Sequence, residues 1–150
     1  MMKGSDRMNG LLSVIIPAYN EQEMIPKAAA TIAEILEQAE ISYELLFVND
    51  GSRDLSWQCI EEAADQNPSI RGLNLSRNFG KESALFAGLS EAVGDCVVVI
   101  DCDLHHPPEK IVEMYRLWQE GYEVVEGIKS SRGKESPVHT FAASCFYKLI

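Results

Sequence analysis

The sequence predicts an α/β fold, a mostly parallel sheet with helices on both faces. Short apolar runs alternate with amphipathic stretches after residue 10, and strict strand–helix alternation is typical of such sheets. Clusters of Gly, Pro, Asn and Ser separate the runs, as expected of turns. The 150 residues are enough for one domain with a core. We expect a disordered tail over residues 1–10 and one domain over residues 11–150.

The first half of the chain predicts three strands and two helices. In the first helix, apolar residues recur at positions 25, 28, 29, 32, 35, 36 and 39, which is the stripe of an amphipathic helix. Ser52 is the expected cap of the second helix, and Asn67-Pro68 would end it. The expected strands are Leu11–Pro17, Tyr43–Val48 and Ile70–Leu75, and the expected helices are Met24–Ala39 and Asp54–Gln66.

The second half continues the alternation. Gly94 suits the C-cap of a third helix, and the apolar run after it predicts a central strand. Pro107 and Pro108 suit the first turn of a fourth helix, and residues 130–136 read as a polar loop. The expected helices are Lys81–Val93, 107 to about 119, and Pro137–Ile150, and the expected strands are Cys96–Ile100 and Tyr122–Glu126.

Composition excludes several classes of protein. The net charge of −10 argues against a nucleic-acid binder, which usually has a basic face. The four cysteines form no CxxC pair, so we expect a reducing compartment and no disulfide framework. We see no signal peptide and no apolar run near the roughly 20 residues of a membrane span. The last residues read as helix without a capping signal, so we expect a fragment of a longer protein.

Polar motifs follow four of the predicted strands. Because ligands of open parallel sheets bind at the carboxyl ends of the strands, the coincidence indicates one ligand site more strongly than any single motif. The motifs are Ala18-Tyr19-Asn20-Glu21, Asn49-Asp50-Gly51-Ser52, Ser76–Lys81 and Asp101–His105.

The most informative pair is Asp101 and Asp103. Alternation along a strand points both carboxylates to one side and Cys102 to the other. Two adjacent acids repel each other unless a cation lies between them, and a divalent cation that also holds a phosphorylated ligand is the usual solution. The alternative is helix N-capping, but only one acid is needed for a cap and both lie too far upstream. The pair therefore indicates an enzyme that handles a nucleotide diphosphate.

Lys81 opens a predicted helix, where a cation opposes the helix dipole. A bound phosphate would relieve this conflict, so we interpret Lys81 as a donor-binding residue; the alternative is a side chain that simply points to water. Gly80 before it favours a turn or a close backbone approach.

These motifs resemble those of the family 2 glycosyltransferases, which have the GT-A nucleotide-sugar fold, a Rossmann-like arrangement. Within the family, the chain is most similar to the polyprenyl-phosphate sugar transferases of the dolichyl-phosphate mannose synthase and bactoprenol glucosyltransferase type. The resemblance runs from residue 12 to about residue 150. It rests on SVIIPAYNE (13–21), VNDGS (48–52), LSRNFGKESALFAGL (75–89), IDCDLHHPPE (100–109) and VVEGIKSSRGKES (124–136).

The resemblance implies a donor site. Asp50 would bind the base, although an Asn-Asp-Gly-Ser run is also a good turn. Asp101 would support the nucleotide-sugar, and Asp103 would ligate the metal. Residues expected to line the nucleoside pocket are Pro17, Tyr19 and Glu21.

The resemblance also assigns roles to His105, Lys129 and Arg132. His105 stands where many relatives have a glutamine that ligates the metal; it would favour Mn²⁺ over Mg²⁺, and the alternative is a solvated loop residue. Lys129 and Arg132 match basic positions that meet phosphate, Arg132 as a catalytic residue; the alternative is again a solvated loop. Lys129 replaces a frequent arginine and so lacks its bidentate fork.

The implied activity is metal-dependent transfer of a sugar, with inversion, from a UDP- or GDP-sugar to a polyprenyl phosphate such as undecaprenyl or dolichyl phosphate, with Mg²⁺ or Mn²⁺ as cofactor. We expect it to serve cell-envelope glycan or glycolipid synthesis at the cytoplasmic face of the membrane. This segment is expected to be soluble, and a C-terminal part would join it to the membrane. The protein could form a homo-oligomer. The alternatives are transfer to a polysaccharide hydroxyl and a noncatalytic fragment that binds nucleotide-sugar.

Overall fold

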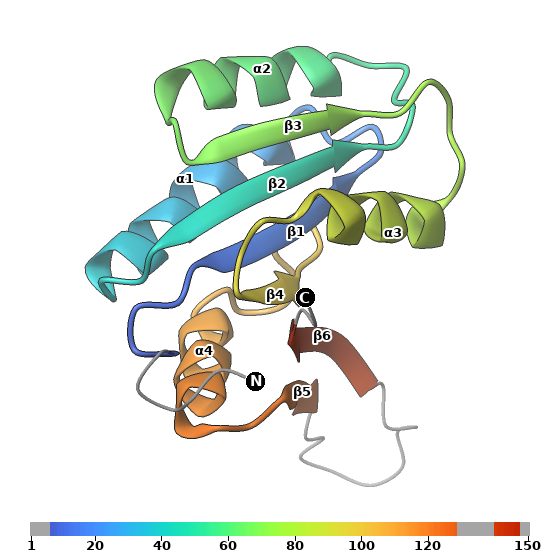
Figure 1. The fold of residues 1–150 in the computed structure, drawn as a ribbon. Helices are drawn as coiled ribbons and strands as arrows, with labels where there is room; N and C mark the ends of the chain where they lie inside the picture. Colours follow the sequence, from blue (N-terminus) through green and yellow to red (C-terminus); the bar gives the residue numbers. More distant parts are fainter. Residues whose placement is uncertain (1–6, 129–139, 148–150) are drawn as a thin grey trace, which may run out of the picture.

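The computed structural model describes residues 7–128 and the backbone of residues 140–147. Within these residues the strands form one six-stranded sheet in the order β3-β2-β1-β4-β6-β5 (Figure 1). The strands are β1 (Leu12–Ala18), β2 (Tyr43–Asn49), β3 (Ile70–Asn74), β4 (Cys96–Val99), β5 (Val124–Ile128) and β6 (Thr140–Tyr147), and the helices are α1 (Met24–Gln38), α2 (Ser56–Gln66), α3 (Lys81–Glu91) and α4 (Lys110–Glu120).

The strands β3, β2, β1 and β4 are parallel to one another. Their register brings the ends of β1 and β2 together, with Ala18 opposite Asn49, and Asn49 opposite Asn74 of β3. The N–H of Asp50 donates to the carbonyl of Ala18 over 2.9 Å. The loops that follow β1, β2 and β3 therefore start side by side at one edge of the sheet.

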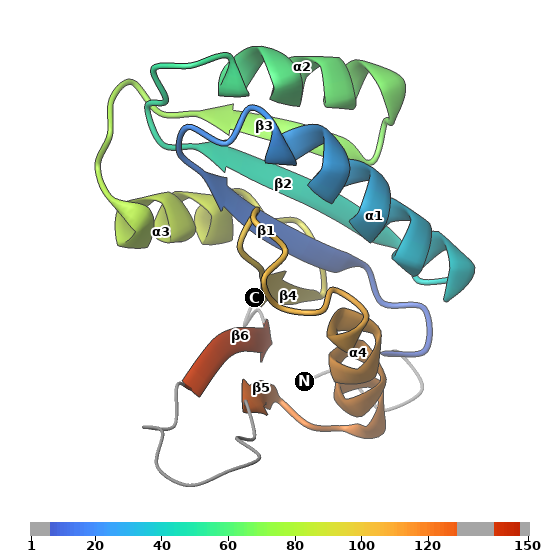
Figure 2. The same ribbon diagram turned by 180° about the vertical axis from the view of Figure 1, so that it is seen from behind.

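The helices cover both faces of the sheet, as predicted. Helices α1, α2 and α4 share the larger apolar core, which includes Ile32, Phe47 and Trp118. Helix α3 covers the opposite face (Figures 1 and 2). A side chain at Gly88 would place its Cβ 2.6 Å from Cγ2 of Ile15, so the glycine lets α3 lie close to β1.

The segment at residues 140–147 differs from the prediction. The expected helix Pro137–Ile150 is wrong there: these residues form β6, which runs antiparallel between β4 and β5. Thr140, Phe141, Phe146 and Tyr147 are β-formers, and β4 offers an open edge beside them. Pairing with neighbouring strands thus determines the secondary structure of this segment, because the periodicity of its sequence is ambiguous. Residues 137–139 and 148–150 lie outside the described residues, as does the predicted loop 130–136.

Both predicted caps are wrong. Helix α2 has Leu55 as its N-cap, and Ser52 instead accepts the N–H of Asn20 over 2.9 Å. Helix α3 ends at Glu91, and its C-cap is Ala92 rather than Gly94. A Cβ at Gly94 would lie 2.5 Å from Oγ of Ser13, so this glycine permits close packing against β1 instead of ending a helix.

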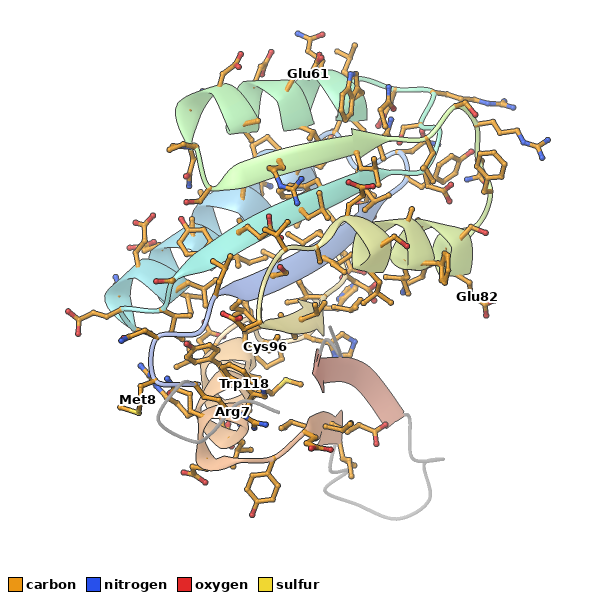
Figure 3. All side chains as sticks on the ribbon, viewed as in Figure 1. Arg7, Met8, Glu61, Glu82, Cys96 and Trp118 are labelled. Carbon is orange, nitrogen blue, oxygen red and sulfur yellow. The ribbon has the colours of Figure 1, made fainter. Side chains whose placement is uncertain are left out.

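The residues before β1 pack on α4. Arg7 is buried, its Nη1 donates to the carbonyl of Trp118 over 2.8 Å, and its guanidinium lies 5.2 Å from the centroid of the Trp118 ring (Figure 3). The hydroxyl of Tyr115 donates to the carbonyl of Gly10 over 2.7 Å. The predicted disordered tail is therefore wrong for residues 7–10, while residues 1–6 lie outside the described part. No helix in that part is long and apolar enough to cross a membrane.

Candidate functional site

A pocket of about 240 Å³ opens at the carboxyl ends of β1, β2 and β4. The predicted donor-site residues that the structure describes all line it, except His105. The lining residues are Pro17, Ala18, Tyr19, Glu21, Asp50, Lys81, Asp101, Cys102 and Asp103. The topology thus brings residues from four distant segments of the sequence to one place.

Asp101 and Asp103 reach the pocket from a turn and not from a strand, because β4 already ends at Val99. Their side chains are 36% and 39% exposed, whereas Cys102 between them packs in the core. Burial raises the pKa of the Cys102 thiol to about 12, and nearby Glu21 and the two aspartates add to the rise. The expected separation of Cys102 from the two acids is observed, and Cys102 stays a neutral thiol.

His105 lies next to Asp103 at the edge of the pocket. Its N–H donates to Oδ1 of Asp103 over 3.1 Å, and its Nε2 lies 3.7 Å from Oδ2 of the same residue. Leu104 between them has a φ of 57°, which turns the chain sharply. The His105 side chain is 82% exposed, so its imidazole is accessible from solvent beside the Asp103 carboxylate.

Glu21 adds a third carboxylate. Burial raises its pKa, and the charges of Asp103, Asp54 and Asp101 raise it further. This concentration of negative charge favours a cation. No cluster of three or more metal-ligating side chains occurs in the described part of the chain, but Mg²⁺ at phosphate sites commonly uses one or two carboxylates together with phosphate oxygens. Asp101 and Asp103 fit a cation shared with a phosphate in this way.

Lys81 extends into this acidic pocket. It is the first residue of α3, and its Nζ lies 2.6 Å from Oδ1 of Asp101. Gly80 before it has a φ of 99°, a value that only glycine adopts readily. The positive φ of Gly80 lets the chain enter α3 beside the pocket.

Asp50 holds the loop that leads to Lys81. Its side chain is almost fully buried; Oδ1 accepts the N–H of Phe79 over 2.8 Å, and Oδ2 accepts the N–H of Gly80 over 3.1 Å. Gly51 has a φ of 65°, and a Cβ there would lie 2.2 Å from the carbonyl carbon of Arg77. Asp50 therefore fixes the loop at residues 77–80, and it also lines the pocket.

The sequence does not predict a set of hydrogen bonds between the loops after β1 and β2. Asn20 accepts the N–H of Arg53 over 2.8 Å, and its own N–H donates to Ser52. The N–H of Glu21 donates to Oγ of Ser56 over 2.8 Å. Asn and Ser in both loops were the only available signal, since these side chains bind backbone groups of turns. The two loops are thereby joined, and they hold Tyr19 and Glu21 at the pocket.

Asp54 strengthens this junction. Burial opposes its ionisation, but hydrogen bonds from the hydroxyl and N–H of Ser56 and from the N–H of Gln22 hold the pKa of Asp54 below its usual value.

Lys129 and Arg132, the predicted phosphate-binding residues, lie outside the described residues, and their roles stay predictions.

Comparison with known proteins identifies the family. Residues 13–141 match the family model of glycosyl transferase family 2. An uncharacterized glycosyltransferase of Synechocystis sp. is 44% identical over 139 residues, covering 93% of this chain and 44% of that protein. The bactoprenol glucosyl transferase of Shigella phage SfV is 40% identical over 138 residues, covering 92% of this chain and 45% of that protein. The chain spans less than half the length of these relatives.

Solved structures agree with the fold. A mannosyltransferase from Pyrobaculum calidifontis, PcManGT in complex with GDP-Man and Mn²⁺, is 26% identical with a TM-score of 0.60, covering 68% of this chain and 30% of that one. TarS of S. aureus in complex with UDP is 19% identical with a TM-score of 0.64, covering 91% and 46%, and shows the fold alone. The GT-A fold is thus confirmed, and the chain belongs to glycosyl transferase family 2.

Proposed function

We propose that this chain forms the donor site of a metal-dependent, inverting glycosyltransferase that moves a sugar from a UDP- or GDP-sugar to a polyprenyl phosphate. The observation that carries the proposal is the convergence of Asp101 and Asp103 with Lys81 in one pocket at the carboxyl ends of the strands. Relatives named bactoprenol glucosyl transferase, 40% identical over 92% of the chain, support the lipid acceptor.

The donor would bind across the pocket. Pro17, Tyr19 and Glu21 would contact the nucleoside, and Asp50, which also lines the pocket, would meet the base. Lys81, at the start of α3, would bind the diphosphate, where the helix dipole also favours negative charge.

Asp103 would hold the metal together with His105, and Asp101 would support the donor and share the cation with Asp103. The cation, Mg²⁺ or Mn²⁺, would stabilise the negative charge that develops on the departing nucleoside diphosphate. PcManGT, solved with GDP-Man and Mn²⁺, supports a metal of this kind. Lys129 and Arg132 would meet phosphate groups of donor or acceptor.

A phosphate acceptor explains why the site needs no strong general base. The second pKa of a phosphomonoester is about 6, so the acceptor is already anionic near neutral pH. Its oxygen attacks the anomeric carbon from the face opposite the diphosphate; the new carbon–oxygen bond forms as the bond to the diphosphate breaks, and the configuration inverts. We place this reaction at the cytoplasmic face of a membrane, in cell-envelope glycan or glycolipid synthesis.

The first test is calorimetric titration of the intact protein with UDP and with GDP, with and without Mn²⁺. We expect one nucleotide to bind, and only in the presence of the metal. Asp103→Ala should abolish the metal-dependent part of the binding, whereas Glu113→Ala, which removes an exposed carboxylate of α4 outside the pocket, should change nothing. Unchanged metal-dependent affinity in Asp103→Ala would show that the metal site is wrongly assigned.

The acceptor is tested by turnover with the matching nucleotide-sugar. We expect sugar to appear on undecaprenyl phosphate and none on a polysaccharide hydroxyl. Transfer to the polysaccharide alone would refute the lipid acceptor and keep the donor site. Tight nucleotide-sugar binding without any transfer by the intact protein would instead favour a binding role.

A further inference from the structure

Lys81 is the single positive side chain among the described residues that line the pocket. Its Nζ forms an ion pair with Oδ1 of Asp101 over 2.6 Å. The two side chains are 59% and 36% exposed, and ion pairs this open to water contribute little to stability. The pair can therefore break without disturbing the fold.

The ammonium of Lys81 occupies the carboxylate that a metal would approach. A divalent cation near Asp101 would meet a positive charge already in contact with Oδ1, and like charges at such distances repel each other. A metal would thus compete with Lys81 for the Asp101 carboxylate. In the protein without ligand, Lys81 offsets part of the repulsion among Asp101, Asp103 and Glu21.

The surrounding structure lets the side chain move while the backbone stays in place. Asp50 binds the N–H groups of Phe79 and Gly80, which fixes the loop before Lys81. The lysine side chain itself has four flexible carbons and a compact charge without directional preference. A phosphate near the start of α3 would draw the ammonium toward it.

We propose that Lys81 is a placeholder cation: it occupies Asp101 while the donor site holds no ligand, and it transfers to the diphosphate of the nucleotide when the metal takes Asp101. The inference rests on the proposed function and adds an order to binding. Metal alone binds weakly, because it must displace the ammonium from Asp101. The nucleotide removes Lys81 from Asp101, so nucleotide and metal each raise the affinity for the other, as linkage requires.

The test measures Mn²⁺ alone and then each of UDP and GDP at saturating Mn²⁺, in the intact wild type and in Lys81→Gln, Lys81→Arg and Lys110→Gln. Free Mn²⁺ is followed by electron paramagnetic resonance and nucleotide binding by calorimetry. Lys110 is a matched control, because it also forms an exposed ion pair, with Glu113 over 2.9 Å, but lies outside the pocket. Circular dichroism checks that each variant is folded.

We expect opposite effects in Lys81→Gln. Affinity for Mn²⁺ alone should rise on the order of tenfold, within the range typical of coupled sites, while nucleotide affinity at saturating Mn²⁺ should fall. Lys81→Arg, which keeps the charge, should return both values toward those of the wild type, and Lys110→Gln should change neither.

Two results in Lys81→Gln would overturn the placeholder. Unchanged affinity for Mn²⁺ alone in Lys81→Gln would mean that the ammonium does not compete with the metal. A simultaneous rise in nucleotide affinity would mean that Lys81 only repels the metal and never reaches the diphosphate. Failure of the wild type to bind either nucleotide with Mn²⁺ would reject the proposed function, and the placeholder with it, and is recognised without any variant.

Discussion

Glu44 and Glu21 lie at opposite ends of the sheet, and their surroundings move their pKa values in opposite directions. Glu44, near the start of β2, is buried, yet hydrogen bonds from Ser13, Val93 and Arg71 outweigh that burial and lower its pKa. No described residue donates a hydrogen bond to the Glu21 carboxylate; burial and the neighbouring aspartates raise its pKa. The Glu44 carboxylate, which serves the fold, has its donors within the protein, whereas the Glu21 carboxylate at the pocket receives none from the described residues and can receive a ligand.

The geometry around Glu44 makes the contrast concrete. Its Oε1 accepts the hydroxyl of Ser13 over 2.6 Å and the N–H of Val93 over 2.9 Å, and its Oε2 accepts Nε of Arg71 over 2.9 Å. Arg71 also donates to the carbonyl of Glu91 over 2.8 Å. The cluster therefore joins the starts of β1, β2 and β3 to the end of α3.

The largest effect on stability is expected at Glu44. Glu44→Ala leaves the buried Ser13 hydroxyl and the Val93 N–H without their acceptor, which should lower the free energy of unfolding by about 2–3 kcal/mol. Nucleotide binding should be unchanged below the unfolding transition. Urea denaturation and calorimetry check the two halves of this prediction. A large loss of nucleotide affinity in folded Glu44→Ala would remove the distinction between the two ends.

Asp50 sharpens the comparison, because it is a satisfied carboxylate that lies in the pocket. Asp50→Ala leaves the N–H groups of Phe79 and Gly80 without their acceptor, but water can partly replace it because the loop is exposed. We therefore expect the free energy of unfolding to fall by about 1–2 kcal/mol. Unlike Glu44→Ala, it should also reduce nucleotide affinity, since the loop before Lys81 loses its anchor. Hydrogen exchange of residues 77–81 should speed up; unchanged exchange would show that Asp50 does not hold the loop.

The two glutamates should give opposite dependences of stability on pH. The folded pKa of Glu44 is lowered, so its stabilisation is present above its unfolded pKa and is lost as pH falls through the folded value. The folded pKa of Glu21 is raised, so its destabilisation appears as pH rises through that value and vanishes below the unfolded pKa. Between pH 7 and pH 3, the free energy of unfolding of Glu44→Gln should therefore fall less with acid than that of the wild type. Glu21→Gln should be more stable than the wild type chiefly near pH 7. Denaturation at a series of pH values measures both. Identical profiles for both variants would contradict the assignment.

The smallest effect on stability is expected at Asp103. Asp103→Asn removes one of the mutually repelling charges and keeps an oxygen for the N–H of His105. The free energy of unfolding should stay unchanged or rise by a few tenths of a kcal/mol, as for exposed charges, while metal-dependent nucleotide binding disappears. A loss above roughly 1 kcal/mol in urea denaturation would assign Asp103 a structural role instead.

The pocket was predictable because its signal is periodic and local. Polar motifs that follow apolar strands lie at the carboxyl ends of the strands in a parallel sheet, and this held for Tyr19, Asp50 and Asp101 even though β4 ends before Asp101. The prediction failed where long-range contacts decide. Ser52 reads as a cap but binds the loop after β1, and Gly94 reads as a helix end but packs on Ser13.

The segment at residues 140–147 shows the same limit on a larger scale. Its sequence allows a helix or a strand, and pairing with β4 and β5 determines that it forms β6. Likewise, the hydrogen bonds between Asn20 and the loop after β2 join residues more than 30 positions apart, which no local pattern reveals.

The place of β6 in the sheet has a consequence for folding during synthesis on the ribosome. Strands β1 to β4 are complete once residue 99 has left the ribosome, but among the described strands β5 pairs with β6 alone, and β6 fills the remaining side of β4. Until residues 140–147 emerge, the nascent chain exposes the unpaired edge of β4, a template for pairing with other chains. In the interval between these two points of synthesis, a chaperone that covers the β4 edge would prevent such pairing.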